Sequence, residues 1–395
     1  MSTQELAPLP RLAPSRRGVI WAASACAVMS GAAIAPAIPA IEAALGASQA
    51  SVWGRVALVL PAFVIMCAGP WIGRRTAQVD QRMGFVIALC AMAAMGVAGG
   101  FAQNFGWLLA TRIGLGLATA ATLCFATAAI AALFEGETRG HVISRQAAIN
   151  TFGGVGFVLV GGLLAQLGWQ VPFLLYLLTL PVAFFAAGLD WRAPASPQLD
   201  ATTRPPMQAI RLPLVTVGLA MTAFYLVPVQ APFVPVLVET PALSGLVIAC
   251  ATLVSGLVSL RIGALLQTVS GPVAQAAAII AVVLGLLEFG LAASVPALLL
   301  AAALIGAGFG ALLPMTVRQI MTHSTPATAN AIAGLIASAL YAGQVAASAL
   351  ALILSYGNPR LPFYATALGL GLAAFLWTNR ANLRPWAQWL RENAA

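Results

Sequence analysis

The sequence predicts an all-α membrane protein with twelve transmembrane helices in two pseudo-symmetric six-helix bundles. Three observations lead to this fold class: the apolar composition, the placement of the arginines, and a motif that occurs twice. Of the 395 residues, 61% are hydrophobic and 7% are charged, whereas soluble domains carry about 25% charged residues. The mean hydropathy is +0.94. The chain therefore has far more apolar surface than a soluble core needs.

Continuous apolar runs divide almost the whole chain. A run of at least about 18 residues can cross the ~30 Å hydrocarbon layer as a helix. A transmembrane barrel would instead show alternating segments of about ten residues. The sequence has twelve runs of about the helical length, and they lie at 19–41, 52–72, 83–101, 108–134, 146–167, 171–189, 212–236, 243–262, 273–293, 296–317, 331–355 and 363–378.

The arginines predict the orientation of the chain in the membrane. All 19 basic residues are arginines. If the N-terminus lies in the cytoplasm, only Arg55, Arg112 and Arg360 fall toward the outside, which is the positive-inside bias. We therefore expect a multi-pass protein of the inner (plasma) membrane with both termini in the cytoplasm. The net charge of +9 is then a topology signal and not a sign of nucleic-acid binding.

A short motif with two prolines occurs once in each half of the chain. Ala35–Ile41 reads A-P-A-I-P-A-I, and Ala231–Leu237 reads A-P-F-V-P-V-L, each at the far end of an apolar run. Prolines disturb a helix, so we expect an interruption at both places. Duplicated halves with interrupted helices are typical of transporters whose halves move about a central site. The prolines predicted to be flex points of an outer gate are Pro36, Pro39, Pro232 and Pro235.

The chain divides at a polar, proline-rich stretch. Residues 190–211 lie between the sixth and seventh apolar runs, and we expect a cytoplasmic linker there. The predicted units are an N-terminal six-helix bundle at 1–189 and a C-terminal six-helix bundle at 212–395. Within the second unit, the spacing Gly306-x-x-x-Gly310 is typical of close helix packing in membranes.

The loops after the second and eighth runs share a pattern. The first has Gly69, four residues, and then Arg74 and Arg75, and the second has Gly256, four residues, and Arg261. On these residues the chain resembles the major facilitator superfamily, whose signature between helices two and three begins with glycine and contains basic residues. The resemblance implies the major facilitator fold over essentially the whole chain.

Other residues resemble the drug–proton antiporters of that superfamily in part. The segment from Arg112 to Gly116 reads R-I-G-L-G and is similar to the arginine-to-glycine motif associated with proton coupling. The aspartate of the loop signature is replaced by Gly73, with Asp80 and Arg82 nearby as candidate substitutes or as ordinary loop charges. The glycine–proline pair that is diagnostic of antiport is absent from the fifth run.

Two charged residues, Arg112 and Glu288, lie inside apolar runs and away from the ends of those runs. An arginine in the membrane core costs at least about 2.5–3.5 kcal/mol on insertion scales, so Arg112 should face a cavity or a partner unless it snorkels to the interface. There it would hold an anionic substrate or lower the proton affinity of a nearby acid. Glu288 would be a proton carrier if buried, or would reach water from the outer third of its helix.

Neutral polar side chains mark a candidate path for a solute. Several follow helical spacing along one face of a run. Each could line the path or could hydrogen-bond across a helix interface. The predicted substrate-lining residues are Ser30, Thr119, Asn150, Thr151, Thr222, Tyr225, Tyr341 and Gln344.

No enzyme motif or metal-ligand spacing occurs in the sequence. His141 and His323 lie far apart, and a Walker motif needs a lysine, which the chain does not contain. We expect no enzymatic activity, no metal and no cofactor, with a proton gradient as the energy source.

These observations predict a secondary active transporter that works by alternating access and exports a small organic solute in exchange for protons. One alternative is uptake of a small organic anion, with Arg112 as its counter-ion. Another is a non-transporting membrane sensor or scaffold on the same fold. The expected partners are a small-molecule substrate and the lipid bilayer, without nucleic acid, and we expect a monomer.

Overall fold

A computed structural model gives the arrangement of most of the chain. The residues that it describes are 14–46, 53–76, 78–134, 136–188, 206–324, 328–355, 358 and 360–378. All secondary structure within them is helical. Ten helices are long and apolar enough to cross a membrane, and two shorter apolar helices cover Val171–Ala186 and Leu361–Leu372. Together they correspond to the twelve predicted runs and confirm an all-α membrane fold.

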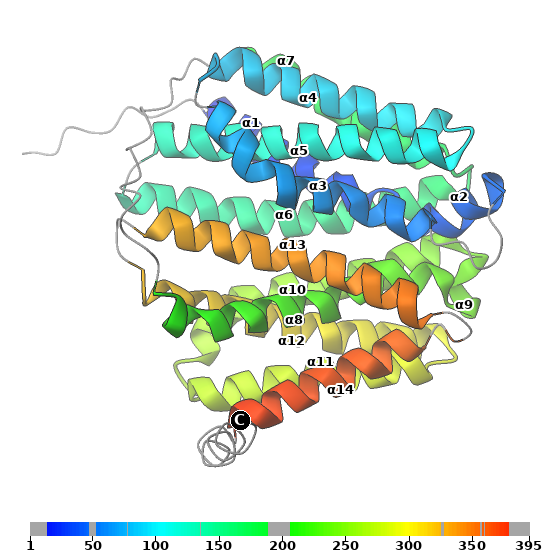
Figure 1. Ribbon diagram of the computed structural model, residues 1–395, viewed down its shortest axis with the longest axis vertical. Helices are drawn as coiled ribbons and strands as arrows, with labels where there is room; N and C mark the ends of the chain where they lie inside the picture. Colours follow the sequence, from blue (N-terminus) through cyan, green and yellow to red (C-terminus); the bar gives the residue numbers. More distant parts are fainter. Residues whose placement is uncertain are drawn as a thin grey trace, which may run out of the picture.

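The helices lie side by side, with the first half of the chain above the second in Figure 1. The elements of the first half, with η for 3-10 helices, are α1 (Pro14–Ala32), η1 (Ala35–Ala37), α2 (Ile38–Ala44), α3 (Trp53–Thr76), α4 (Gln81–Ala98), η2 (Gly99–Phe101), α5 (Phe105–Leu133), α6 (Gly136–Ala165), η3 (Val171–Leu178) and α7 (Thr179–Ala186). The elements of the second half are α8 (Met207–Gln230), η4 (Ala231–Phe233), α9 (Pro235–Val238), α10 (Pro241–Leu265), α11 (Gly271–Leu291), α12 (Val295–Met321), α13 (Ala329–Leu354) and α14 (Leu361–Thr378).

The two halves repeat the same helix pairings. In the first half α3 and α4 both pack on α5, α1 packs on α6, and α4 packs on α7. In the second half α10 and α11 both pack on α12, α8 packs on α13, and α11 packs on α14. Each pairing thus recurs between equivalent helices, as a duplicated six-helix unit requires. The halves meet along α6 with α10 and along α3 with α13, which are again equivalent pairs.

Polar side chains fix where two of the long helices begin. The Asp80 side chain accepts a hydrogen bond from the Met83 N–H at 2.7 Å and caps α4. The Asn104 side chain accepts from the Trp107 N–H at 2.8 Å and caps α5. Such caps satisfy backbone N–H groups that have no partner within the helix.

Both proline motifs interrupt a helix, as predicted. The first copy forms η1 and α2, and the second forms η4 and α9. The copies differ in one joint. In the first, Ala37 is helical, so η1 continues directly into α2, whereas in the second, Val234 is extended, with φ −71° and ψ 130°, between η4 and α9.

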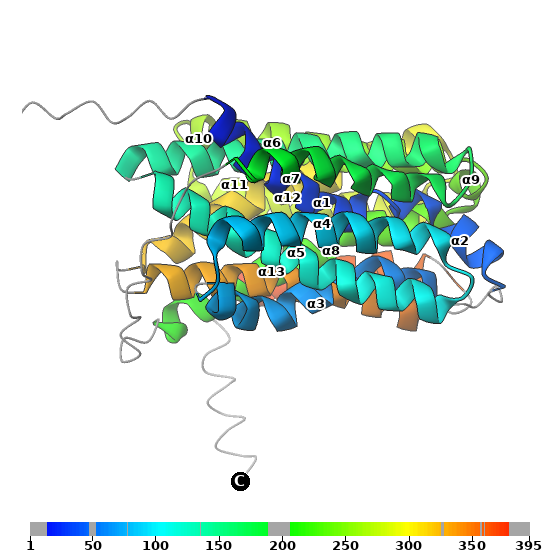
Figure 2. The same ribbon diagram turned by 90° about the horizontal axis from the view of Figure 1, so that it is seen from above.

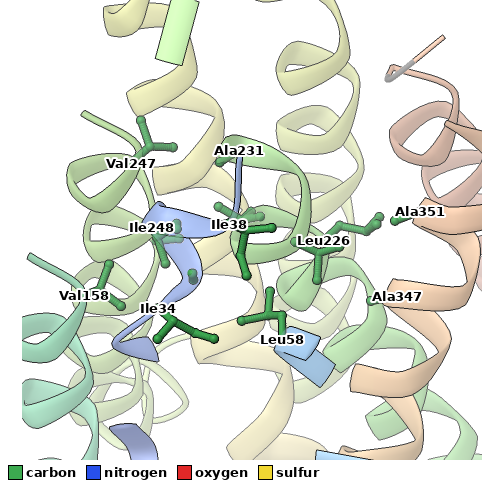
Figure 3. Packing of buried hydrophobic residues seen from close by; sticks show 14 of the residues in the cluster. Ile34, Ile38, Leu58, Val158, Leu226, Ala231, Val247, Ile248, Ala347 and Ala351 are labelled. Carbon is green, nitrogen blue, oxygen red and sulfur yellow. The ribbon is translucent and has the colours of Figure 1, made fainter. Parts of the chain in front are cut away.

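The interruptions lie at one end of the bundle and contact each other there. Figures 1 and 2 both place α2 and α9 at the same end, and η1 packs on η4. We call this the η1–η4 end. The largest buried cluster joins the halves near it: Figure 3 shows Ile34 and Ile38 of the first half among Leu226, Ala231 and Ile248 of the second. Apolar packing therefore closes the η1–η4 end.

The predicted linker is shorter on its C-terminal side. Helix α8 begins at Met207, directly after Pro206, so 207–211 are helical. Residues 189–205 lie outside the described part of the chain. The division into units at 1–189 and 212–395 stays a prediction.

The Gly306-x-x-x-Gly310 spacing marks close packing, as predicted. A Cβ added at Gly306 would collide with the carbonyl oxygen of Ala251, and one at Gly310 with that of Ser255. Both partners belong to α10. The α10 and α12 backbones can approach so closely because these positions carry no side chain.

We expect Gly310→Ala to lower the free energy of unfolding by about 1–3 kcal/mol, because the added methyl overpacks this contact. The measurement is thermal unfolding of the purified protein in detergent. Gly263→Ala is the matched control in α10, where an added Cβ meets nothing within 4 Å. An equal loss of stability in both variants would contradict the packing role.

Candidate functional site

A cavity lies in the middle of the bundle, between the two halves. Its volume is about 310 Å³, at the lower end of the range of about 300–1,000 Å³ for small-molecule sites. Its wall comes from α1, α3, α5 and α6 of the first half and from α8, α10 and α13 of the second. The polar residues of the wall are Ser24, Ser30, Asn150, Tyr225, Thr252, Tyr341 and Gln344.

Several predicted lining residues lie in this wall. Ser30 comes from α1, Asn150 from α6, and Tyr225 from α8. Tyr341 and Gln344 both come from α13, where residues three apart share one face. The helical spacing in the sequence thus brings these side chains to a common space, and their contact with a solute stays a prediction.

The wall offers hydrogen-bonding groups without charge. None of the described residues that line the cavity is Asp, Glu, Lys, Arg or His. Within the described part of the chain, the side chains of Tyr225, Tyr341 and Gln344 have no hydrogen-bond partner, and the Asn150 Oδ1 atom is buried without one. Buried polar groups of this kind are normally satisfied, so these are places where a bound molecule could donate or accept.

Three predicted residues lie outside the cavity and bond to helix backbones instead. The hydroxyl of Thr119 donates to the Leu115 carbonyl, and that of Thr151 donates to the Ala147 carbonyl, each one turn earlier in its own helix. The Thr222 hydroxyl lies 2.9 Å from the Gly218 carbonyl of its own helix and 3.2 Å from the Gly343 carbonyl of α13. Threonine commonly bonds back to the carbonyl four residues earlier. Of the three, only Thr222 bonds across a helix interface, whereas Thr119 and Thr151 bond within their own helices.

Arg112 is fully buried behind the cavity wall. Its side chain has 0% exposure, which excludes snorkelling to the interface. Its Nη1 donates to the Tyr176 hydroxyl at 3.2 Å, and its Cζ lies 5.0 Å from the centroid of the Phe173 ring. Within the described part of the chain, its Nε and Nη2 atoms have no hydrogen-bond partner. The guanidinium is therefore held by aromatic side chains and not by a carboxylate.

Tyr176 connects Arg112 to the cavity wall. Its hydroxyl donates to the Met29 carbonyl at 3.0 Å and lies 3.4 Å from the Ser30 carbonyl, and Ser30 lines the cavity. Arg112 is thus connected to the cavity wall through Tyr176 and the backbone of α1. Arg112 itself does not line the cavity.

Glu288 belongs to a helix that contributes no described residue to the cavity wall. It lies on α11, which packs on α12 and α14, and its side chain is half-buried. It does not line the cavity. Its predicted role in proton coupling stays a prediction, without a structural link to the solute path.

Comparison with known proteins decides the family. A sequence profile of the Major Facilitator Superfamily matches residues 20–271, which is more than half of the chain. The chain belongs to the Major Facilitator Superfamily. Members of this superfamily are membrane transporters, so the chain is a transporter and not an enzyme. Comparison with curated protein sequences gives no match.

Solved superfamily structures share the fold. A bacterial homologue of the human lysosomal transporter Spinster, inward-facing and occupied, has a TM-score of 0.69 and 18% identity, covering 93% of this chain and 96% of that one. The xylose transporter XylE from E. coli, partially occluded and inward-open, has a TM-score of 0.71 and 15% identity, covering 92% of this chain and 98% of that one. The human organic anion transporter MFSD10 has a TM-score of 0.63 and 17% identity, covering 92% of this chain and 100% of that one.

The superfamily's loop signature makes local contacts. The Gly69 carbonyl accepts from the Cys124 thiol at 3.9 Å, and the Arg75 guanidinium lies 5.2 Å from the Trp71 ring centroid. Arg74 lies beside Arg75 near the end of α3. Asp80, the candidate substitute for the missing aspartate, is used as the cap of α4.

The second copy of the loop pattern begins at the junction of the halves. A Cβ at Gly256 would lie 2.5 Å from the Cγ2 atom of Thr151, so α10 approaches α6 closely there. Arg261 is exposed further along α10. Gly256 therefore serves packing between the halves.

Sequence reasoning missed the walls formed by α3 and α10. Leu58, Pro61 and Ile65 of α3 and Ile248 and Ala251 of α10 line the cavity. These side chains are apolar and look like ordinary membrane-facing residues in the sequence. Only the equivalence of the second and eighth runs could have pointed to them.

We expect Tyr176→Phe to lower the free energy of unfolding by about 1–3 kcal/mol, because it leaves the buried Arg112 side chain without its hydrogen bond. Thermal unfolding in detergent measures this change. Tyr364→Phe is the matched control, since the half-buried Tyr364 hydroxyl has no hydrogen-bond partner within the described residues. Equal melting temperatures of the two variants would show that the Arg112–Tyr176 hydrogen bond does not stabilise the fold.

Proposed function

We propose that this transporter exports a small, uncharged and partly apolar organic solute in exchange for protons, by alternating access through the central cavity. The observation that carries the choice of solute is the cavity wall, which comes from both halves and whose described residues include hydrogen-bonding groups but no charged side chain. A site between two halves is the place where alternating access is expected to act.

The absence of charge from the described wall argues against an ionic solute. An ion that leaves water for a low-dielectric cavity needs a paired charge or several strong hydrogen bonds. The nearest buried charge described above, Arg112, is separated from the cavity by Tyr176. A neutral solute loses much less hydration and can use the amide and hydroxyl groups of the wall.

The apolar part of the wall suits an aromatic or otherwise flat solute. Phe224 lines the cavity, and its ring stacks on that of Phe309 in α12, with centroids 4.4 Å apart. Stacking holds the Phe224 ring in place, so it offers a fixed apolar surface. Tyr225 and Tyr341 add rings that carry a hydroxyl.

Orientation and energy source belong to the same proposal. The arginine distribution supports an inner-membrane protein with both termini in the cytoplasm and the η1–η4 end outside. Proton coupling is supported by the resemblance of the Arg112 segment to the antiporter motif. We propose that the protein works as a monomer.

Uptake of an organic anion is the second candidate. The observation that favours it is the buried Arg112 guanidinium, whose Nε and Nη2 atoms have no partner within the described residues. An anion could pair with it only if Tyr176 moved aside. The charge of the solute therefore distinguishes the two candidates.

A thermal-shift screen of the purified protein tests the solute class, because a ligand of the native state raises its stability by about 2.7 kcal/mol at 100 times its Kd. Each uncharged amide in the screen is paired with its carboxylate. We expect amides to bind at least about 60-fold more tightly than their carboxylates, since an unpaired charge in the membrane costs at least about 2.5 kcal/mol. Preference for the carboxylates would favour the anion candidate.

Two glycine variants show whether binding occurs in the cavity. A Cβ at Gly31 would lie 2.9 Å from the Tyr225 hydroxyl, so we expect Gly31→Val to fill the cavity and abolish binding of the best amide. Gly18→Val, on the same helix with nothing within 4 Å, is the control. Unchanged binding in Gly31→Val would place the site elsewhere.

Flux in inverted vesicles with an imposed proton gradient tests coupling and direction. We expect the best amide to accumulate inside the vesicles only when the gradient is present, and Arg112→Gln to reduce this accumulation about tenfold or more. Equal flux with and without the gradient would rule out proton coupling. Binding without any flux would favour the sensor.

A further inference from the structure

The η1–η4 end contains a polar contact between the halves within its apolar surroundings. Helix α3 of the first half begins here, and α8 of the second half ends here. Arg55, in the first turn of α3, reaches across to the second half. Its side chain is half-buried in a region where η1 and η4 supply only alanine, proline and phenylalanine.

Arg55 makes two contacts with the second half. Its Nε donates to the Oε1 of Gln230 at 3.2 Å, and its Cζ lies 3.8 Å from the centroid of the Phe233 ring. A planar guanidinium can stack on a ring and donate from its edge at the same time. Both contacts depend on the position of η4 relative to α3, so they exist only while this end is closed.

Gln230 also makes a hydrogen bond to the end of a third helix, α13. It is 1% exposed, and its Nε2 donates to the Ser355 hydroxyl at 2.5 Å. Ser355 is the C-cap residue of α13. Through Gln230, Arg55 is therefore connected to the ends of both α8 and α13, which pack on each other and line the cavity.

The carboxyl group near Arg55 belongs to the first half. The Glu42 Oε1 accepts from the Gly54 N–H at 3.0 Å, in the first turn of α3, where backbone N–H groups lack helical partners. A Cβ at Gly54 would collide with this carboxylate, so glycine is needed for the approach. The elements that pack on α2 are α3, η1 and η4, and of these only α3 has charged residues, with Arg55 at this end.

This arrangement makes the contact between the halves reversible. Opening the η1–η4 end would break the hydrogen bond to Gln230 and the contact with Phe233. Glu42 and Arg55 would move together, because both belong to the first half. Opening therefore does not separate the Arg55 guanidinium from the Glu42 carboxyl group.

We propose that Arg55 is the latch of the η1–η4 end: it positions the two halves in the closed arrangement through Gln230 and Phe233 and is released when this end opens. The proposal rests on alternating access, as does the proposed function, but it does not depend on the identity or charge of the solute or on proton coupling.

Labelling of the cavity from each face of the membrane tests the latch. The five native cysteines, Cys26, Cys67, Cys90, Cys124 and Cys250, are first replaced. A single cysteine is then introduced in the cavity wall by Val28→Cys. A membrane-impermeant maleimide is added to right-side-out or to inside-out vesicles, and the labelling rates are compared. No solute is needed, so failure of the proposed transport function leaves this test unaffected.

We expect Arg55→Gln to raise the labelling rate from the η1–η4 face about tenfold or more, which is the effect of losing one charge-assisted hydrogen bond on a two-state equilibrium. The rate from the opposite face should fall. A purely structural role would not change the two faces in opposite directions. Arg55→Lys should give labelling rates between those of the wild type and of Arg55→Gln. It keeps a positive charge near the Phe233 ring but lacks the planar guanidinium that can stack on the ring and donate to Gln230 at the same time.

Two further variants keep the test decisive. Arg360→Gln is the matched control, because Arg360 is an exposed arginine at the same end whose described hydrogen bonds all use its backbone. It should leave both rates unchanged. If Arg55→Gln does not fold, Gln230→Leu removes the same contact from the second half and should give the same shift. Unchanged rates on both faces in a folded Gln230→Leu or Arg55→Gln variant would overturn the proposal.

Discussion

The fold depends on one constraint: a backbone inside hydrocarbon must satisfy its N–H and C=O groups within the protein. Long α-helices meet it over most of the described chain, and 3-10 segments such as η3 meet it elsewhere, but the two proline motifs break helices near the junction of the halves. There the chain uses short 3-10 turns, with the Ala37 N–H bonded to the Ile34 carbonyl at 2.9 Å and the Val234 N–H bonded to the Ala231 carbonyl at 3.1 Å. The two interruptions also cover each other, since η1 packs on η4 and their prolines Pro36 and Pro232 are buried. Closure of one end of the cavity is thus a consequence of where the helices are broken.

Charge is distributed so that it surrounds the cavity without entering it. Arg112 lies behind Tyr176, and Arg55 lies at the closed end beside Glu42, so each guanidinium has its own local partners. The wall itself has hydroxyl and amide groups on an apolar background. This separation lets the charged groups hold helices in position, while the described wall of the cavity offers only uncharged hydrogen-bonding groups.

The sequence predicted those features of the fold that leave a periodic pattern or a repeated motif. The apolar runs became helices, the two proline motifs became interruptions, and Tyr341 and Gln344 came to one face of α13 and into the cavity wall. Periodicity identifies a face of a helix but not the neighbour that covers it. For this reason it could not show that Thr119 bonds to its own backbone or that Arg112 is buried against aromatic rings. The apolar parts of the cavity wall on α3 and α10 could not be predicted from the sequence, because the same residues would also suit contact with lipid.

The charge-free wall has an electrical consequence. A membrane potential does work only on charge that crosses the membrane, about 2.3 kcal/mol per elementary charge per 100 mV. The proposed neutral solute would take no charge with it, and the fixed charges Arg55 and Arg112 remain part of the moving helices. Under that proposal, steady current during transport would come from coupled ions alone. The ratio of this current to the solute flux would then give the number of ions moved per turnover.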